Sequence, residues 1–233
     1  TANSGEILGI AGISGCGQKE LLEAIAGLQP VESGSIDYIK DDGTHEALLG
    51  KDPLAIADLG VALSFVPEDR LGMGLVGNMD LADNMMLRSF RRGHGLFTDR
   101  KSPRKLAQEV VDDLEVSTPG ISTPVRRLSG GNVQKVLVGR EIASAPTVLL
   151  TAYAVRGLDI NSSYTIYDLI NRQKKKGVAV IYVGEDLDVL LELADRILVL
   201  CGGKVSGIVE GRKTSKREVG MMMTKLGGDK ADE

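Results

Sequence analysis

The chain of 233 residues lacks or has little of the side chains that many functions need. It has no Trp, two Cys (Cys16 and Cys201) and two His (His45 and His94). Two thiols cannot build a disulfide framework, and their spacing fits no zinc site. Two histidines also exclude a His-rich metal site. Reduced cysteines in a cytoplasmic compartment are the simplest interpretation.

Strong charge and long apolar runs are absent as well. Lys and Arg number 28 against 32 Asp and Glu, a net charge of −4, whereas binding to nucleic acid needs a strongly basic face. No apolar run approaches the roughly 20 residues that span a bilayer. The start, TANSGEI, lacks both Met and the build of a signal peptide. We therefore expect a piece of a longer chain.

Short apolar runs alternate with amphipathic segments along most of the sequence. Strands that alternate with helices indicate an α/β fold with a parallel sheet. A mostly helical stretch at about 72–130 interrupts this alternation as an insertion. The expected strands are 6–11, 34–39, 61–66, 147–151, 178–183, 196–200 and 204–209. The expected helices are 19–27, 80–91, 104–115, 131–143, 162–175, 187–193 and 215–225, followed by a tail at 227–233.

A glycine-rich turn joins the first expected strand to the first expected helix. Its skeleton, G-x-x-G-x-G from Gly12 to Gly17, suits a phosphate-binding loop, because glycines let backbone N–H groups point at phosphate oxygens. Gln18 stands at the lysine position of such a loop, and Lys19 stands at the position of the magnesium-binding Ser or Thr. Taken alone, the skeleton fits a plain strand-to-helix turn equally well. The candidate nucleotide-binding residues are Gly12, Gly15, Cys16, Gly17, Gln18 and Lys19.

The segment LSGGNVQK at 128–135 opens another expected helix. It resembles the signature sequence of ABC-type ATPases. The resemblance implies that this helix start meets the γ-phosphate of ATP held by a second domain, where small residues and free N–H groups suit an anion. The alternative is an N-cap serine followed by glycines, without a ligand. The residues that carry the resemblance are Leu128, Ser129, Gly130, Gly131, Asn132 and Gln134.

Further segments match the same family in order. VPEDR at 66–70 resembles its Q-loop region, 148–159 its Walker B strand and D-loop, and 180–187 its switch strand. The residues of these segments are similar to those of the second, C-terminal ATPase half of tandem ATPases that serve simple-sugar and nucleoside importers. The resemblance implies a P-loop ABC-type nucleotide-binding domain, with a core at 1–71 and 131–226 and a helical subdomain at about 72–130. The family's first strands would precede Thr1.

The hydrolytic positions depart from the family pattern. The Walker B Asp-Glu pair is replaced by Ala152 and Tyr153, the Q-loop glutamine by Glu68 and the switch histidine by Glu185. Phosphoryl transfer depends on charge neutralisation by lysine and magnesium. We therefore expect this P-loop site to bind nucleotide weakly and not to turn over ATP, and we assign it no catalytic or metal-binding residue. Counting the P-loop, the degenerate positions are Gln18, Lys19, Glu68, Ala152, Tyr153 and Glu185.

Each ABC site pairs the P-loop of one domain with the signature of another. The resemblance therefore implies that the signature, with the D-loop residues Gly157, Leu158 and Asp159, completes a partner's site that holds ATP and Mg²⁺. The implied partners are an N-terminal ATPase half, transmembrane permease subunits and, indirectly, an extracytoplasmic substrate-binding protein, with no nucleic acid. The implied location is the cytoplasmic face of the membrane, with Glu68–Met86 against a permease loop.

Other functional hypotheses remain open at this stage. A non-transport ABC protein of ribosomes or DNA repair usually keeps both sites intact. A P-loop kinase would leave LSGGNVQK unexplained. A regulatory module with a dead nucleotide pocket overlaps the importer hypothesis, and nucleotide titration with and without magnesium separates the two.

Overall fold

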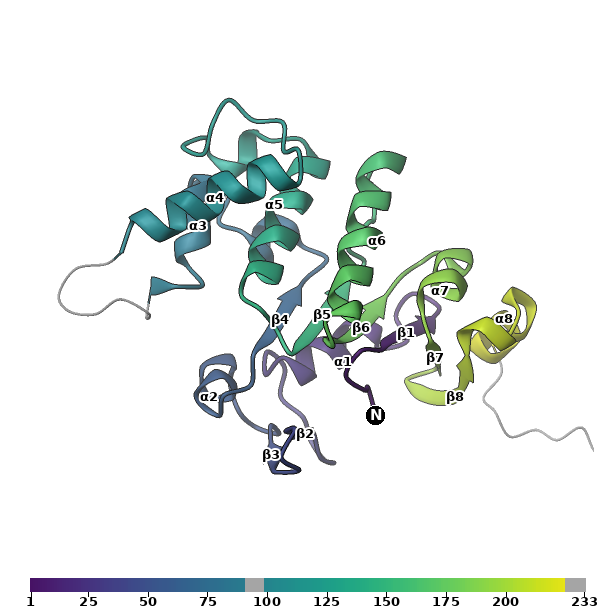
Figure 1. The fold of residues 1–233 in the computed structure, drawn as a ribbon. Coiled ribbons are helices and arrows are strands. Elements are labelled where there is room, and N and C mark those ends of the chain that lie inside the picture. Colours follow the sequence, from purple (N-terminus) through teal and green to yellow (C-terminus); the bar gives the residue numbers. More distant parts are fainter. Residues whose placement is uncertain (91–98, 225–233) are drawn as a thin grey trace, which may run out of the picture. The chain divides into compact units, whose positions relative to one another are not determined.

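The computed structural model describes residues 1–90 and 99–224, which form two compact units (Figure 1). The first, here the core unit, comprises Thr1–Phe65, Thr147–Tyr153 and Asn171–Glu233. The second, here the helical unit, comprises Val66–Pro146 and Ala154–Ile170. The expected tail at 227–233 and the last residue of the expected helix 80–91 lie outside the described residues.

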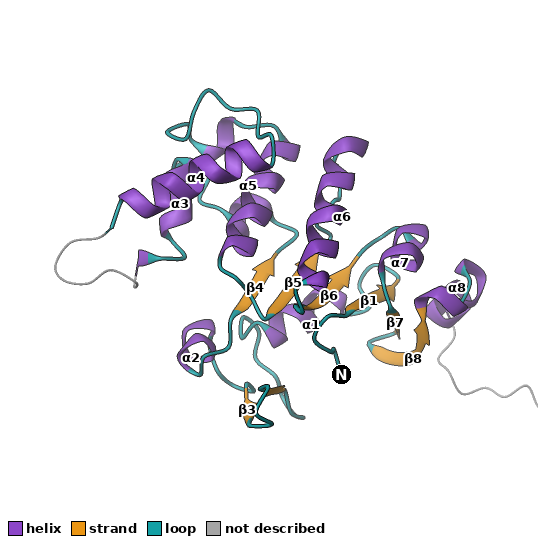
Figure 2. Cartoon of the chain, viewed as in Figure 1, coloured by secondary structure: helices purple, strands orange, loops and turns teal. Residues whose placement is uncertain are grey.

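A six-stranded sheet forms the centre of the core unit (Figure 2). Its spatial order is β4-β5-β6-β1-β7-β8. Strands β5, β6, β1 and β7 pair in parallel, and β8 is antiparallel to β7. Strands β1, β5 and β6 are buried along most of their length, as is typical of the central strands of a parallel sheet. The strands are β1 (Ile7–Gly12), β4 (Leu63–Val66), β5 (Val148–Ala152), β6 (Ala179–Val183), β7 (Arg196–Cys201) and β8 (Lys204–Glu210).

Short helices pack on this sheet. Helix α1 (Gln18–Ile25) contacts β1 and β5, α7 (Leu187–Leu193) contacts β1, and α8 (Lys216–Thr224) contacts β7. The α/β fold with a parallel sheet, expected from the alternating pattern, is therefore confirmed.

Three small elements lie apart from this alternation. The expected strand 34–39 is shortened to β2 (Asp37–Ile39), which pairs with β3 (His45–Ala47) in a separate two-stranded sheet. Helix α2 (Pro53–Asp58) follows, and its N-cap Asp52 accepts a hydrogen bond from the Ala55 N–H at 2.8 Å. Neither β3 nor α2 was expected, because each is too short to show a clear hydrophobic period.

The helical unit contains a π-helical turn at Arg70–Gly74, α3 (Leu81–Met86), α4 (Lys101–Asp113), α5 (Gly130–Ala143) and the first part of α6 (Ile160–Lys175). Helix α4 begins earlier than expected because Asp99 accepts a hydrogen bond from the Lys101 N–H at 2.8 Å, which fixes the helix start there. Within the described residues, no helix combines the length and apolarity needed to cross a membrane.

Candidate functional site

The P-loop turn lies between β1 and α1 in the core unit. Gly15 and Gly17 have φ angles of +84° and +96°, a region that favours glycine. Among the described residues, a Cβ at either position would meet nothing within 4 Å, so the demand for glycine there is conformational. The Cys16 N–H donates to the Ile13 carbonyl at 3.1 Å, which closes the turn.

Gln18 folds back over this turn. Its side chain is buried, with 2 % exposed, and its Nε2 donates to the same Ile13 carbonyl at 3.1 Å. A Cβ at Gly12 would lie 2.5 Å from that Nε2, so a larger residue at position 12 would displace the Gln18 amide. Lys19 is directed elsewhere, since its Nζ lies 3.7 Å from a carboxylate oxygen of Glu23. Neither side chain presents a cation to the turn.

The end of β5 is apolar where a magnesium site would need carboxylates. Ala152 is fully buried and shares a hydrophobic cluster with Cys16 of the P-loop turn, and Tyr153 packs against that cluster. Tyr153 has a φ of +50°, and its N–H donates to the Val183 carbonyl at 2.9 Å. These side chains cannot ligate Mg²⁺, which binds carboxylate, hydroxyl or water oxygens. Within the described residues, no three His, Cys, Asp or Glu side chains are grouped to hold a metal ion.

Glu185 lies at the carboxyl end of β6 in the core unit. It is exposed and follows Gly184, where a Cβ would come within 2.6 Å of the Tyr182 ring. The next residue, Asp186, caps α7 by accepting from the Asp188 N–H at 2.8 Å. The glutamate therefore occupies the loop between a buried strand and a helix start.

The signature segment forms the exposed start of α5 in the helical unit. Ser129 is the N-cap, and its Oγ accepts from the Asn132 side-chain amide at 2.9 Å and from the Asn132 N–H at 3.4 Å. Ser129 and Gly130 are exposed, and the described first turn of α5 has no acidic residue to occupy its N–H groups. Gln134 is 1 % exposed and, among the described residues, neither of its amide atoms has a hydrogen-bond partner.

The D-loop lies against the signature segment within the helical unit. A Cβ at Gly131 would be 2.8 Å from Ser162 Oγ and 3.4 Å from an Asp159 carboxylate oxygen. The Asp159 carboxylate accepts from the Ser162 N–H at 2.9 Å and from its hydroxyl at 2.7 Å. These hydrogen bonds, the backbone one first, hold the pKa of Asp159 below its ordinary value. Gly157 turns the preceding chain with a φ of +67°.

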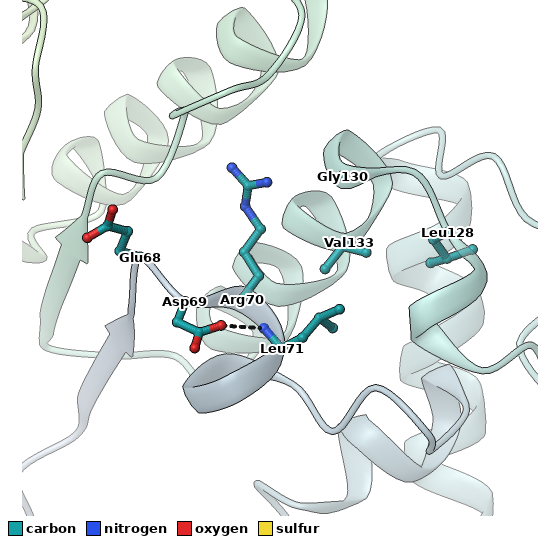
Figure 3. A pocket seen from close by; sticks show the side chains of 7 residues that line it. All are labelled: Glu68, Asp69, Arg70, Leu71, Leu128, Gly130 and Val133. Atoms are coloured by element: carbon teal, nitrogen blue, oxygen red, sulfur yellow. Dashed lines mark hydrogen bonds between the residues drawn. The ribbon is translucent and has the colours of Figure 1, made fainter.

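A pocket of about 400 Å³ opens beside the start of α5 (Figure 3). Arg70 extends between Glu68 and Gly130, and its Nη1 lies 3.4 Å from where a Gly130 Cβ would be. Its Nη2 donates to the Arg156 carbonyl, and Arg156 forms an ion pair with Glu68. Burial lowers the pKa of Arg70. The lining residues are Glu68, Asp69, Arg70, Leu71, Leu128, Gly130 and Val133.

The sequence pointed to Glu68 as a site residue but to neither Arg70 of this pocket nor Arg156, which pairs with Glu68. Both arginines lie in segments that carry the resemblance, Arg70 at the end of VPEDR and Arg156 within 148–159. The pairing joins residues that are far apart in the sequence, so no local pattern could predict it. Its consequence is that the Glu68 charge is balanced inside the helical unit.

Comparisons with known proteins agree with the motifs. The family profile described as "ABC transporter" matches residues 1–151. The chain is 36 % identical over 215 residues to the xylose import ATP-binding protein XylG of Moorella thermoacetica, and 36 % identical over 230 residues to the nucleoside import ATP-binding protein NupA of Lactococcus lactis subsp. cremoris. These alignments cover 92 % and 97 % of this chain but 42 % and 44 % of the relatives. The chain thus spans less than half the length of the curated relatives it matches.

Solved structures share the fold. A dimeric ATP-binding cassette bound to ADP and Pi has a TM-score of 0.76 and 23 % identity, over 92 % of this chain and 89 % of that one. An ATP-binding subunit of an ABC transporter has a TM-score of 0.73 and 19 % identity, over 97 % and 90 %. These likenesses confirm the α/β P-loop fold of the ABC type. With the family match over most of its length, the chain belongs to the ABC transporter family.

Proposed function

We propose that this chain is the ATP-binding domain of an importer for a simple sugar or a nucleoside. In this proposal its own P-loop site is inactive, and its signature segment completes the ATP site of a partner ATPase domain. The single observation that carries the proposal is the contrast between the two sites. The P-loop turn is closed on its own side chains, whereas the start of α5 is exposed and capped only by Ser129.

Support for an inactive P-loop site comes from the core unit. A triphosphate with magnesium needs a cation and oxygen ligands, and catalysis of its hydrolysis depends on both. The positions that would supply them hold the neutral amide of Gln18, the buried methyl of Ala152 and the phenol of Tyr153. Backbone N–H groups of the turn still suit phosphate, so weak binding that does not depend on magnesium is the expected residual property.

Support for a role in trans comes from the helical unit. The first-turn N–H groups of α5 carry partial positive charge and favour an anion. Gly130 and Gly131 let a ligand approach the backbone closely. The Asp159 carboxylate is engaged by Ser162, which holds the D-loop against the signature segment. ATP and Mg²⁺ would be held by the P-loop of the partner.

The substrate class follows from the relatives. Similar proteins are named as import proteins for xylose, galactose and methyl galactoside, ribose, glucose or a nucleoside. The chain corresponds to 41–44 % of the length of these relatives, and we propose that it is part of a longer protein in which a second ATPase half is the partner domain.

An apolar surface on the helical unit fits a membrane-subunit partner. It surrounds a pocket of about 580 Å³ at the π-helical turn and includes Leu71, Met73, Val76 and Leu87, each 37–46 % exposed. The buried side chain of Asn84 holds this loop, since it accepts from the Val76 N–H at 2.8 Å and donates to the Val76 carbonyl at 3.1 Å. We name this set the docking surface, and propose that it receives a permease loop at the cytoplasmic face of the membrane.

The test uses the longer protein assembled with its permease in liposomes. Ser129→Arg places a long cation over the start of α5, so it should abolish ATP hydrolysis although the P-loop of this chain is untouched. Ser102→Arg, an exposed position on α4, is the matched control and should leave the rate unchanged. Unchanged hydrolysis in Ser129→Arg would refute the role in trans. Magnesium-dependent hydrolysis that survives inactivation of the partner's P-loop would refute the inactive site.

A further inference from the structure

A buried arginine of the signature helix reaches the backbone of the docking surface within the helical unit. Arg140, on α5, is 7 % exposed, and its Nη2 donates to the Gly74 carbonyl at 2.7 Å. Its Nε donates to a carboxylate oxygen of Glu141 at 2.9 Å, and Glu141 is 2 % exposed. Gly74 ends the π-helical turn that carries Leu71 and Met73. One guanidinium therefore links this turn to the helix that begins with the signature segment.

Close packing reinforces the link. A Cβ at Gly74 would lie 2.8 Å from Leu137 Cδ2, so the backbone of the turn rests directly on α5. Burial lowers the pKa of Arg140, and the Glu141 charge opposes that shift. π-Helical turns are rare and concentrate at functional positions. The turn and the helix thus share a backbone contact, an apolar contact and a buried charge.

Stability alone is a poor reason for this arrangement. Removing two charges from water costs several kcal/mol per ion, and apolar residues of similar size often replace buried ion pairs without loss. A guanidinium does what an apolar side chain cannot, because it holds a specific carbonyl and a specific carboxylate at fixed geometry. The Gly74 carbonyl is thereby kept in one position relative to α5.

We propose that Arg140 is a positioning residue that makes the docking turn and the signature helix move as one body. A load applied to Leu71 and Met73 by a membrane subunit is then passed to Ser129 and Gly130. The inference rests on the proposed function, since it supplies the connection between the docking surface and the site completed in trans.

Arg88 provides a matched control. It follows α3, and its Nη2 lies 2.5 Å from the second carboxylate oxygen of Glu141. Arg88 therefore shares the same buried carboxylate as Arg140, whereas the hydrogen bond to the Gly74 carbonyl comes from Arg140. Removing it weakens the ion pair and leaves the bond from Arg140 to the turn.

The first experiment measures the ATPase rate of the longer protein with its permease subunits in liposomes, divided by the rate without them. Arg140→Gln should lower this stimulation at least about fivefold, a typical coupling between two sites. Arg88→Gln should leave the ratio within about twofold of the wild type, because Arg140 still pairs with Glu141 and still holds the Gly74 carbonyl. Equal losses in both variants, or no loss in Arg140→Gln, would overturn the proposal.

The second experiment needs no permease. Amide hydrogen exchange of residues 130–135 is measured in the longer protein for Gly74→Ala, which pushes Leu137. Gly74→Ala alone should raise the exchange rate of these amides at least about fivefold over the wild type. Added to Arg140→Gln, it should not raise the rate above that of Arg140→Gln alone. If it does not respond to Gly74→Ala, the proposed connection is wrong. If instead the wild-type complex shows no stimulation by the permease while exchange responds, the proposed function fails and the connection stands.

Discussion

The side-chain amide of Gln18 donates to the Ile13 carbonyl, 3.1 Å away, inside the P-loop turn. The same carbonyl accepts from the Cys16 N–H. The turn is thus held by hydrogen bonds between its own groups. What it lacks is a cation, because Lys19 faces Glu23.

A lysine at the position of Gln18 should raise the affinity of the P-loop turn for ATP. In the longer protein with its partner P-loop inactivated, Gln18→Lys with Lys19→Thr should bind ATP at least about tenfold more tightly, since a hydrogen bond to a charged group contributes about 1.5–3 kcal/mol. Hydrolysis should stay absent because Ala152 and Tyr153 still offer no magnesium ligand. The measurement is a nucleotide titration with and without Mg²⁺.

Lys19→Thr alone is the control for this titration. It removes the Lys19–Glu23 pair without adding a cation to the turn, so it should not tighten binding. A double variant that binds no better than this control would show that the turn does not face a phosphate.

The sequence predicted the parts of the site that local patterns encode. The glycine turn after the first strand and the helix start at Gly130 were predicted because strand-turn-helix motifs are contiguous. The shared cluster of Cys16 and Ala152 could not be predicted, since it depends on how β1 and β5 are arranged in the sheet.

Partners that are distant in the sequence account for the other omissions. The Glu68–Arg156 ion pair and the Arg140–Gly74 hydrogen bond join segments whose side-chain types suggest no particular partner. Charged residues usually indicate solvent-exposed surface, so a buried Arg140 is invisible without the packing around it. The start of α4 differs from the expected one for a related reason. It is set by one hydrogen bond to Asp99, which leaves no trace in the hydrophobic period of the sequence.

Gly139→Ala and Gly220→Ala should shift stability in opposite directions. A Cβ at Gly139 would lie 2.7 Å from Val110 Cγ1 and 3.0 Å from Leu114 Cδ1, so these buried side chains must shift. We expect this overpacking to cost about 1–3 kcal/mol, more than the about 0.5–1 kcal/mol that alanine gains over glycine within a helix. Among the described residues, nothing lies within 4 Å of a Cβ at Gly220 on α8. Alanine there should stabilise the helix by about 0.5–1 kcal/mol.

Amide hydrogen exchange measures the effect of each variant on its own helix, because stability is not uniform across a structure. Protection of α5 should fall in Gly139→Ala, and protection of α8 should rise in Gly220→Ala. An unchanged α5 would mean that Val110 and Leu114 can move aside freely.

Asp195 should make the core unit sensitive to acid. Burial raises the pKa of Asp195. Hydrogen bonds from the Ile7 N–H at 2.9 Å and from Lys174 Nζ at 2.5 Å outweigh this effect, so the pKa lies below its ordinary value of 3.8. The unfolded chain therefore binds the proton more tightly. This contribution to the free energy of unfolding is complete above about pH 5 and is lost as the pH falls through the folded pKa.

The Asp195→Asn variant should unfold more easily at pH 7 and lose less stability than the wild type between about pH 5 and pH 2. Asp188→Asn is the matched control, because its ion pair with Lys216 is exposed on both sides and contributes little. Denaturant titrations at a series of pH values give the slope of the free energy of unfolding against pH for each variant. Identical slopes for Asp195→Asn and the wild type would mean that this carboxylate is not ionised preferentially in the folded state.

Charge on the docking surface should uncouple the chain from its membrane partner. Met73 is 46 % exposed at the π-helical turn, and a carboxylate there cannot be buried against an apolar loop without a cost of several kcal/mol. Met73→Glu should therefore reduce co-purification of the permease with the longer protein about tenfold or more, while its thermal unfolding stays the same. Met221→Glu, at 49 % exposure on α8, carries the same change outside this surface and should retain the permease. Loss of the permease in both variants would indicate a general effect of added charge, and retention in both would place the membrane contact elsewhere on the chain.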